Sequence, residues 1–379
     1  MRYYLIAGEA SGDLHGANLM RGILKCDPQA AFRFWGGDGM AAAGGDANLA
    51  RHYKTASFFG VTEVIANART IMAQMRECKA DIAAYKPDAL ILIDYPGFNL
   101  RMAAYARKLG IRVLYYIAPK VWAWKESRVK LLRRYVDRLY IIFPFETDYF
   151  ASKGISAVFE GNPLVDVVEQ RRNGMPRRNE FLSAHGIDPD RPVIALLAGS
   201  RRSEIRYNLP LMVEIARSLP DRQFAVAGVP WLERRLYDKY LAGTDIKFLC
   251  DCTEELLHHS EAAVVTSGTA TLEAALIGIP EVVLYRTDPL QAYGRHLVLH
   301  IPYVSLVNLI LGRECVKELI QSNMDCTEAV RELRSLLCDG SKRMRMLSDF
   351  TELRGILGGP GASDRFAADM VEYIKDQNA

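Results

Sequence analysis

The 379-residue sequence lacks a long apolar run, and no segment reaches the ~20 consecutive apolar residues that a membrane-spanning helix needs. The first residues also lack the apolar stretch of a signal peptide, because Glu9 and Asp13 interrupt it at once. These absences predict a protein that is made and kept in the cytosol.

Strong charge and paired cysteines are missing as well. The formal net charge of +3 is too small to indicate nucleic-acid binding. The seven cysteines are odd in number and form no C-x-x-C pair, so we expect reduced, mostly buried thiols. His296 and His300 are four residues apart but lack the acidic partner of a zinc motif, and we therefore expect no metal.

The residues that are present indicate an α/β protein. Half of them are hydrophobic and a quarter are charged, and the length suits two domains. Short apolar runs alternate with helical patterns, which predicts parallel sheets covered on both faces. The predicted strands are residues 3–7, 32–35, 89–93, 113–117, 139–143, 193–197, 223–227, 262–265 and 281–285. The clearest predicted helices are residues 12–25, 65–85, 100–109 and 127–136.

A polar, basic segment at residues 171–178 carries both Gly and Pro and indicates an exposed crossing between domains. We therefore predict two Rossmann-like, doubly wound domains, residues 1–170 and 171–362. A terminal helix at 363–379, with Ser363 as its N-cap, would pack back on the first domain. Two such domains would face a cleft at the carboxyl ends of their strands, where doubly wound sheets bind ligands.

The first domain offers two turns and one carboxylate. Small residues at 8–13 (GEASGD) join a strand to a helix, which suits either a ligand contact or only a tight turn. Residues 37–42 fit G-x-G-x-x-A but follow the second strand and precede a poor helix, so we expect no nicotinamide cofactor. Asp94 ends a strongly apolar strand, where it would be a general base or merely a cap. His15 is the reserve candidate for the base.

The second domain repeats the strand-turn-helix pattern twice. Ser200 and Arg201 follow one strand, and an arginine fork beside helix N–H groups fits a diphosphate. A surface ion-paired turn is the alternative. The segment Ser-Gly-Thr at 267–269 follows another strand, with Glu273 in the next helix. Phosphate can rest on that helix terminus while the carboxylate accepts hydrogen bonds from a ribose diol.

Taken together, these stretches resemble the lipid-A-disaccharide synthase family. The matching residues are 8–13, 93–94, 96, 98–99, 121–124, 144–146, 199–201, 267–270, 272–273, 303–306 and 308–309. Trp-Ala-Trp at 122–124 and Tyr-Val-Ser-Leu at 303–306 are not general features of nucleotide-sugar enzymes, which makes the resemblance specific. The family often has Asp at Gly97 and Pro at Ala198 and Val307. The first departure favours Asp94 as the functional carboxylate.

The resemblance implies a glycosyltransferase-B fold and an anomer-inverting transfer without metal or cofactor. The donor would be UDP-2,3-diacylglucosamine and the acceptor 2,3-diacylglucosamine 1-phosphate, joined β-1,6 with release of UDP. The first domain would bind the acceptor and the second the UDP-sugar. Asp94 would deprotonate the acceptor 6-hydroxyl, and Arg201 would stabilise the departing UDP. The implied substrate contacts are Ser11, Gly12, Ser200, Arg201, Ser267, Gly268, Thr269, Glu273 and Asn308.

Rival interpretations stay open. Another UDP-sugar enzyme of this fold, such as a UDP-N-acetylglucosamine epimerase or a peptidoglycan glycosyltransferase, would act on substrates without acyl chains. A nicotinamide-dependent oxidoreductase would bind NAD rather than UDP. A non-catalytic nucleotide-sugar-binding protein would bind UDP without turnover.

The helix after Gly60 carries one apolar face with basic residues nearby, formed by Val64, Ile65, Ala68, Ile71, Met72 and Met75. Periodicity alone favours a helix that faces the core. Lipid substrates instead favour contact with acyl chains and peripheral association with the inner membrane of a Gram-negative bacterium. The sequence leaves open whether the protein is a homodimer.

Overall fold

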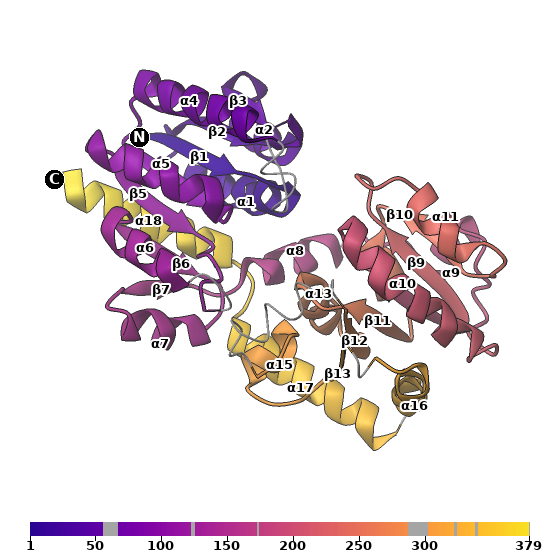
Figure 1. Cartoon of the computed structure of the whole chain (residues 1–379). Helices are drawn as coiled ribbons and strands as arrows, with labels where there is room; N and C mark the ends of the chain where they lie inside the picture. Colours follow the sequence, from indigo (N-terminus) through magenta and orange to yellow (C-terminus); the bar gives the residue numbers. More distant parts are fainter. Residues whose placement is uncertain are drawn as a thin grey trace. The chain divides into compact units, whose positions relative to one another are not determined.

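In a computed structural model the chain divides into two compact units (Figure 1). The structure describes residues 1–55, 67–122, 126–172, 174–286, 302–321, 324–337 and 340–378. The first unit comprises Met1–Asp166 and Leu357–Ala379, and the second comprises Val167–Ile356. The chain passes between them within helices α8 (Pro163–Arg172) and α17 (Ser341–Leu357), rather than in the polar segment at 171–178.

The first unit is built on a parallel sheet of order β3-β2-β1-β4-β5-β6-β7. Its strands are β1 (Arg2–Ala7), β2 (Ala31–Gly36), β3 (Leu49–His52), β4 (Ala89–Ile93), β5 (Arg112–Tyr116), β6 (Arg138–Ile141) and β7 (Ala157–Phe159). The central strands β1, β4 and β5 are almost entirely buried because helices cover both faces, which explains their unbroken apolar sequences.

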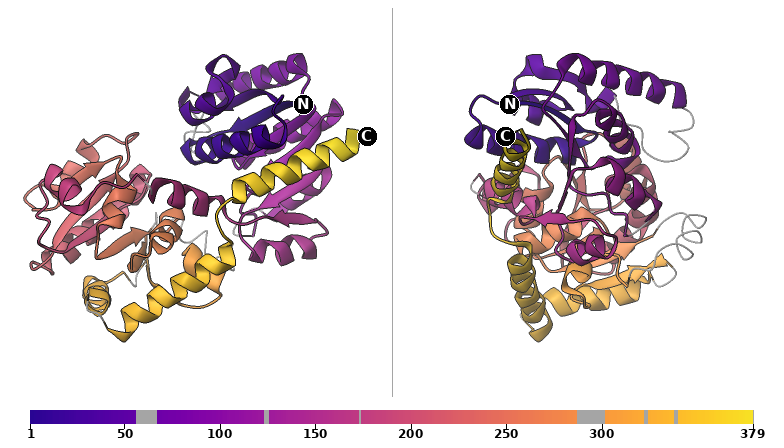
Figure 2. Two further views of the ribbon diagram at one scale, coloured as in Figure 1. Left: turned by 180° about the vertical axis from the view of Figure 1, so that it is seen from behind. Right: turned by 90° about the vertical axis from the view of Figure 1, so that its left-hand side faces the viewer.

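Helices α1 (Ala10–Cys26), α2 (Asp38–Gly44) and α18 (Ala362–Asn378) cover one face, and α18 lies against α1 (Figure 2). The opposite face is covered by α4 (Ala68–Tyr85), α5 (Pro96–Lys108), α6 (Val129–Tyr135) and α7 (Phe145–Ser152). Among the described residues this unit also contains three short 3-10 helices: η1 (Asp46–Asn48), η2 (Tyr53–Thr55) and η3 (Glu126–Arg128).

The second unit contains another parallel sheet, of order β10-β9-β8-β11-β12-β13. Its strands are β8 (Val193–Leu197), β9 (Gln223–Gly228), β10 (Lys247–Cys250), β11 (Ala262–Thr266), β12 (Glu281–Tyr285) and β13 (Lys317–Ile320). Besides the crossing helices, the described part of this unit contains α9 (Arg178–Ala184), α10 (Arg202–Arg217), α11 (Arg235–Leu241), α12 (Thr253–His258), α13 (Thr269–Ile277), α15 (Leu306–Leu311) and α16 (Cys326–Leu337). Both sheets thus have the doubly wound arrangement that the sequence predicts.

Several local predictions were wrong. Residues 38–44 do form a helix, although its glycines suggested otherwise. Ser363 is not the N-cap of α18, because the buried Asp166 carboxylate accepts hydrogen bonds from the N–H groups of Gly361, Ala362 and Ser363. All six cysteines in the described residues are free thiols, but only Cys78 is fully buried.

No helix within the described ranges is long and apolar enough to span a membrane.

Candidate active site

The candidate residues gather at the switch point of each sheet, where the strand order reverses. In the first unit this point lies between β1 and β4, and in the second between β8 and β11. Ligands of doubly wound sheets bind beyond the carboxyl ends of the strands at such points. Gly8 follows β1 and Asp94 follows β4, while Gly199 follows β8 by two residues and Ser267 follows β11 directly. The fold therefore brings the sequence motifs of each unit to its switch point.

Asp94 is held by its backbone in an uncommon conformation. Asp94 and Tyr95 both have positive φ, 41° and 45°, which non-glycine residues seldom adopt. The Asp94 carbonyl accepts hydrogen bonds from Asn99 Nδ2 at 2.8 Å and from the Tyr115 hydroxyl at 2.6 Å. Its N–H donates to the Tyr116 carbonyl on β5 at 3.1 Å. Strain that persists because the surroundings fix it is common at functional sites.

The Asp94 carboxyl is half-buried, and its pKa is raised. Burial, followed by the negative charge of Glu9, raises its pKa to about 6, whereas Lys120 and Arg128 oppose the rise. Glu9 precedes α1 and accepts a hydrogen bond from the Ser11 hydroxyl at 2.7 Å. A carboxylate with this pKa is ionised at pH 7 yet more basic than an exposed aspartate, which suits a general base.

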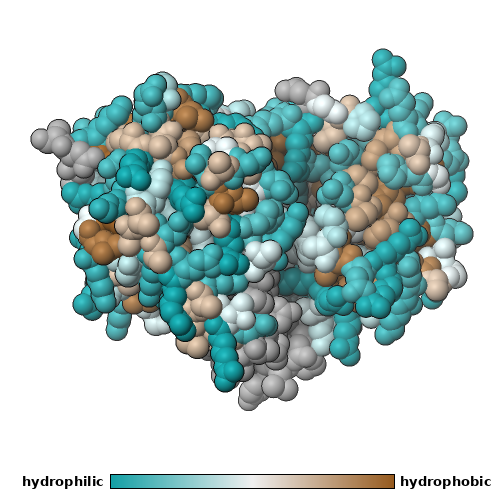
Figure 3. Space-filling model, turned by 90° about the horizontal axis from the view of Figure 1, so that it is seen from above, coloured by the Kyte–Doolittle hydropathy of each residue, from teal (hydrophilic) through white to brown (hydrophobic). Residues whose placement is uncertain are grey.

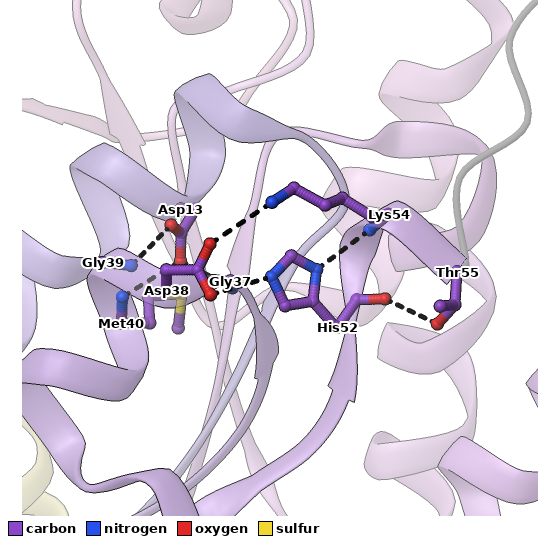
Figure 4. Close-up of polar contacts among 8 residues, drawn as sticks. All are labelled: Asp13, Gly37, Asp38, Gly39, Met40, His52, Lys54 and Thr55. Carbon is purple, nitrogen blue, oxygen red and sulfur yellow. Dashed lines mark hydrogen bonds and ion pairs between the residues drawn. The ribbon is translucent and has the colours of Figure 1, made fainter. Parts of the chain in front are cut away.

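In the turn at residues 8–13, Gly8 and Asp13 make contacts within the first unit, whereas Ser11 is exposed. A side chain at Gly8 would collide with the Tyr95 ring at 2.4 Å, so only glycine fits beside Asp94's turn. The buried Asp13 carboxylate accepts hydrogen bonds from the N–H groups of Gly37, Gly39 and Met40 at 2.6–3.0 Å (Figure 4). The chain's own anion thus occupies the donors of the G-x-G-x-x-A segment.

The remaining residues of this turn differ in exposure. Ser11 is exposed and Gly12 is buried at the start of α1, and His15 is half-buried one turn further along. A Cβ on Gly12 would approach Ala7 to 3.2 Å, so this glycine allows close packing of α1 on β1. Ser11 is therefore the better placed of the two predicted contacts to meet a ligand.

Glu146, on α7, supports the loop that follows β5 and was not identified as functional from the sequence. Its carboxylate is buried and accepts hydrogen bonds from Trp122 Nε1 at 2.8 Å and from the N–H groups of Ile142 and Phe143. Burial raises its pKa to about 7. Glu146 thus holds Trp122 in place. Trp122 lies in the same loop as Lys120, whose charge acts on Asp94. Trp124 lies outside the described residues.

In the second unit, the turn after β8 is tied to its own helix. Gly199 has a φ of 109°, and the Glu204 carboxylate accepts hydrogen bonds from the N–H groups of Ser200 and Arg201 at 2.8 and 3.2 Å. The Arg201 side chain is 64% exposed and donates to Glu204 at 3.0 Å. Because Glu204 occupies these backbone donors, a diphosphate here would be bound chiefly through arginine side chains.

The turn after β11 is open by comparison. Gly268 and Thr269 are exposed, and their N–H groups donate to no described residue. The Ser267 hydroxyl donates to the Val304 carbonyl at 2.7 Å, which joins this turn to the loop before α15. The start of α13 therefore has free donors for an anion, as helix N-termini do.

Glu273, on α13, lies next to a second carboxylate, that of Glu254. Burial, and then the neighbouring Glu254 carboxylate, raises the pKa of Glu273 well above its usual value. Glu254 is buried at the start of α12 and forms an ion pair with Arg171. The sequence placed Arg171 in a solvated linker, whereas it partners this carboxylate pair. No sequence spacing links residues 171, 254 and 273, so the triad could not be found without the fold.

Asn308 is completely buried on α15 and binds the segment that joins this helix to β13. Its side-chain nitrogen donates to the Val316 carbonyl and to Glu318, and its oxygen accepts from the N–H groups of Cys315 and Val316. Glu318 also accepts from the N–H groups of Val304 and Ser305. Asn308 thus acts on the backbone beside Ser267 through Glu318, and any contact of its own with UDP stays a prediction.

The predicted membrane-facing residues divide into three groups. Val64 and Ile65 lie outside the described residues. Met75 packs partly against the core of the first unit, alongside the buried residues Cys78 and Ile82 of α4. Ile71 is half-buried and Met72 is 48% exposed. The apolar face of α4 therefore packs on the core at Met75 and is exposed to solvent at Met72.

Metal ligands are not clustered in the described ranges, which hold no group of three or more His, Cys, Asp or Glu side chains placed to bind an ion. His296 and His300 fall outside the described residues.

Comparisons with known proteins agree with this geometry. The family model for lipid-A-disaccharide synthetase matches residues 3–356. Similar proteins include the lipid-A-disaccharide synthases of Myxococcus xanthus, 37% identical over 98% of this chain and 97% of that protein, and of Syntrophus aciditrophicus, 36% identical with the same coverage.

Solved structures share the fold at low identity. The UDP-GlcNAc 2-epimerase of Neisseria meningitidis, bound to UDP-GlcNAc, superposes with a TM-score of 0.63 at 13% identity, covering 98% of this chain and 100% of that chain. A calicheamicin glycosyltransferase gives a TM-score of 0.57 at 14% identity, covering 99% and 98%. The predicted glycosyltransferase-B type of fold is confirmed.

Proposed function

The chain belongs to the lipid-A-disaccharide synthetase family, and from that premise we propose that it transfers the sugar of UDP-2,3-diacylglucosamine to 2,3-diacylglucosamine 1-phosphate. The product is the β-1,6-linked disaccharide 1-phosphate, and UDP is released. The observation that carries the proposal is Asp94, a strained, half-buried carboxylate of raised pKa at the switch point of the first sheet.

In the proposed reaction Asp94 accepts the proton of the acceptor 6-hydroxyl as its oxygen attacks the anomeric carbon of the donor. The bond from that carbon to the UDP oxygen breaks, and the leaving group carries away the electron pair. Arg201 and the open N–H groups of Gly268 and Thr269 stabilise the charge that grows on UDP. Glu273 accepts hydrogen bonds from the ribose hydroxyls.

The pH dependence of the rate tests Asp94. Only ionised Asp94 accepts a proton, so kcat/KM should rise about tenfold per pH unit below pH 6 and level off above it. The phosphate monoester of the acceptor also titrates at about pH 6 and would give the same rise in kcat/KM. Glu9→Gln distinguishes the two groups, because loss of the Glu9 charge lowers the pKa of Asp94 and moves the rise to lower pH without changing the phosphate. If the rise stays at the same pH in Glu9→Gln, Asp94 is not its source.

The pH dependence of UDP binding tests Glu273 separately. The raised pKa of Glu273 increases its protonated fraction around neutral pH in the free protein, and the ribose diol favours the ionised form. UDP affinity should therefore increase several-fold from pH 7 to about pH 8.5, with proton release on binding. Glu254→Gln should lower the pKa of Glu273 and flatten the dependence. Calorimetry in buffers of different ionisation enthalpy measures both, and a flat wild-type profile would contradict the proposed contact.

We also propose that α4 brings the enzyme to the inner-membrane surface where its lipid substrates reside. In the view of Figure 3, apolar residues form separate patches within a largely hydrophilic surface. On α4, Met72 is exposed and Ile71 is half-buried, and the exposed Arg69 and Arg76 flank them. An amphipathic helix with basic residues beside its apolar face binds anionic lipid surfaces.

Replacing Ile71 and Met72 with serine should weaken binding to anionic liposomes by several-fold while the melting temperature changes little. Met75 is left intact because it packs against the core. Met344→Ser, at an exposed methionine of the second unit, is the matched control. Sedimentation with liposomes measures the effect, and unchanged binding of the double variant would count against this surface.

A further inference from the structure

Trp231 lies in the loop that connects β9 to α11, and none of the sequence motifs includes it. Its side chain is 59% exposed, and it is the only aromatic residue among the large exposed hydrophobics in the described part of the chain. Single exposed apolar residues are common, so exposure alone indicates nothing. Its attachments, however, are specific.

Two contacts fix this loop to the turn after β8. Trp231 Nε1 donates a hydrogen bond to the Ser200 carbonyl at 3.0 Å. Two residues later, Glu233 pairs with Arg202, the first residue of α10, at 3.2 Å. The indole is thus held on the turn that carries Arg201, while most of its surface remains open to solvent.

The strand order places Trp231 beside the path of a bound nucleotide. The turns after β8 and β11, which would hold the diphosphate, are neighbours. Glu273, the proposed ribose ligand, lies beside Glu254 at the start of α12, which packs on α13 and follows β10. The nucleoside therefore extends from β8 and β11 toward the end of β10. Strand β9 lies between β8 and β10, so its loop flanks the nucleoside.

We propose that the exposed face of Trp231 stacks on the uracil of the donor, as a binding residue specific to the nucleoside end of the ligand. The inference rests on the proposed function, because it requires the second unit to bind UDP. An exposed indole fixed by its N–H presents a flat π surface at little cost in side-chain entropy, which suits a planar base.

Calorimetry and fluorescence with UDP test the proposal. Trp231→Ala should weaken UDP binding about tenfold, as loss of base–aromatic stacking does, whereas Trp231→Phe keeps a stacking face and should bind within about threefold of wild type. The sequence has four tryptophans, and the other three, Trp35, Trp122 and Trp124, belong to the first unit. UDP should therefore change the tryptophan fluorescence of the wild-type protein, and Trp231→Phe should abolish that change.

Three results would overturn the stacking. The first is that Trp231→Ala binds UDP like wild type. The second is that Trp231→Ala weakens the binding of a UDP-sugar but not of UDP, which would place the indole on the sugar. The third is that Trp231→Phe binds UDP as poorly as Trp231→Ala, which would reduce the role of Trp231 to its hydrogen bond with Ser200. Met344→Ala, an equally exposed position in the second unit, should leave UDP binding unchanged. If the wild-type protein does not bind UDP, the proposed function fails first. If binding depends on Glu273 but not on Trp231, only this inference fails.

Discussion

Asp94→Asn should lower the turnover of the disaccharide-forming reaction by about 10²–10⁴-fold, the usual contribution of general-base catalysis. Asparagine keeps the shape of the side chain and cannot accept the proton. The hydrogen bonds that hold the strained turn are made by the Asp94 backbone, to Asn99, Tyr115 and Tyr116, and survive the substitution. UDP affinity and melting temperature should therefore change little.

Single-turnover kinetics with both substrates measure this effect on the chemical step. Asp148→Asn is the matched control, because Asp148 is an exposed aspartate on α7 in the same unit. If Asp94→Asn retains more than about a third of wild-type turnover with chemistry rate-limiting, Asp94 is not the base, and His15 becomes the next residue to test. Because Asp94 is partly buried and its turn strained, the melting temperature is measured in parallel.

Arg201→Ala and Glu273→Ala should each weaken UDP binding roughly tenfold or more, because a charge-assisted hydrogen bond contributes ~1.5–3 kcal/mol. The two act at different parts of the ligand, Arg201 on the diphosphate and Glu273 on the ribose. Uridine, which lacks phosphate, should therefore respond to Glu273→Ala and not to Arg201→Ala. Calorimetry with UDP and uridine distinguishes the two contributions.

Arg201→Ala removes the side-chain hydrogen bond to Glu204 but leaves the bonds that Glu204 accepts from the backbone N–H groups of the turn. The turn itself should therefore persist. Arg345→Ala removes an exposed arginine of the second unit and serves as the control. Wild-type UDP affinity in both Arg201→Ala and Glu273→Ala would place the nucleotide elsewhere.

The sequence predicted the central strands and missed the edges. All nine predicted strands are present, and the four that were missed, β3, β7, β10 and β13, are the edge strands of the two sheets. Edge strands are covered by fewer neighbours, and most of their residues are only partly buried. They therefore lack the continuous apolar run by which a buried parallel strand is recognised.

Site residues were predictable where the signal is local. A carboxylate directly after an apolar strand, or small residues before a helix, can be read from neighbouring positions, as Asp94 and Ser267–Thr269 were. The partners of these residues could not be predicted, because they come from distant segments. Glu9 acts on Asp94 across the switch point, and Glu254 joins Glu273 through the packing of α12 on α13. Asp13 and Glu204 further show that a helix N-terminus with a phosphate-binding pattern can be occupied by the chain's own carboxylate.

In the proposed function, this chain joins two diacylated glucosamine units. The most direct measurement mixes the purified protein with UDP-2,3-diacylglucosamine and 2,3-diacylglucosamine 1-phosphate and analyses the products by mass spectrometry. We expect the tetraacyl disaccharide 1-phosphate together with an equal amount of UDP, and no disaccharide when UDP-N-acetylglucosamine replaces the donor. Absence of the disaccharide with both acylated substrates, or turnover of UDP-N-acetylglucosamine alone, would contradict the claim.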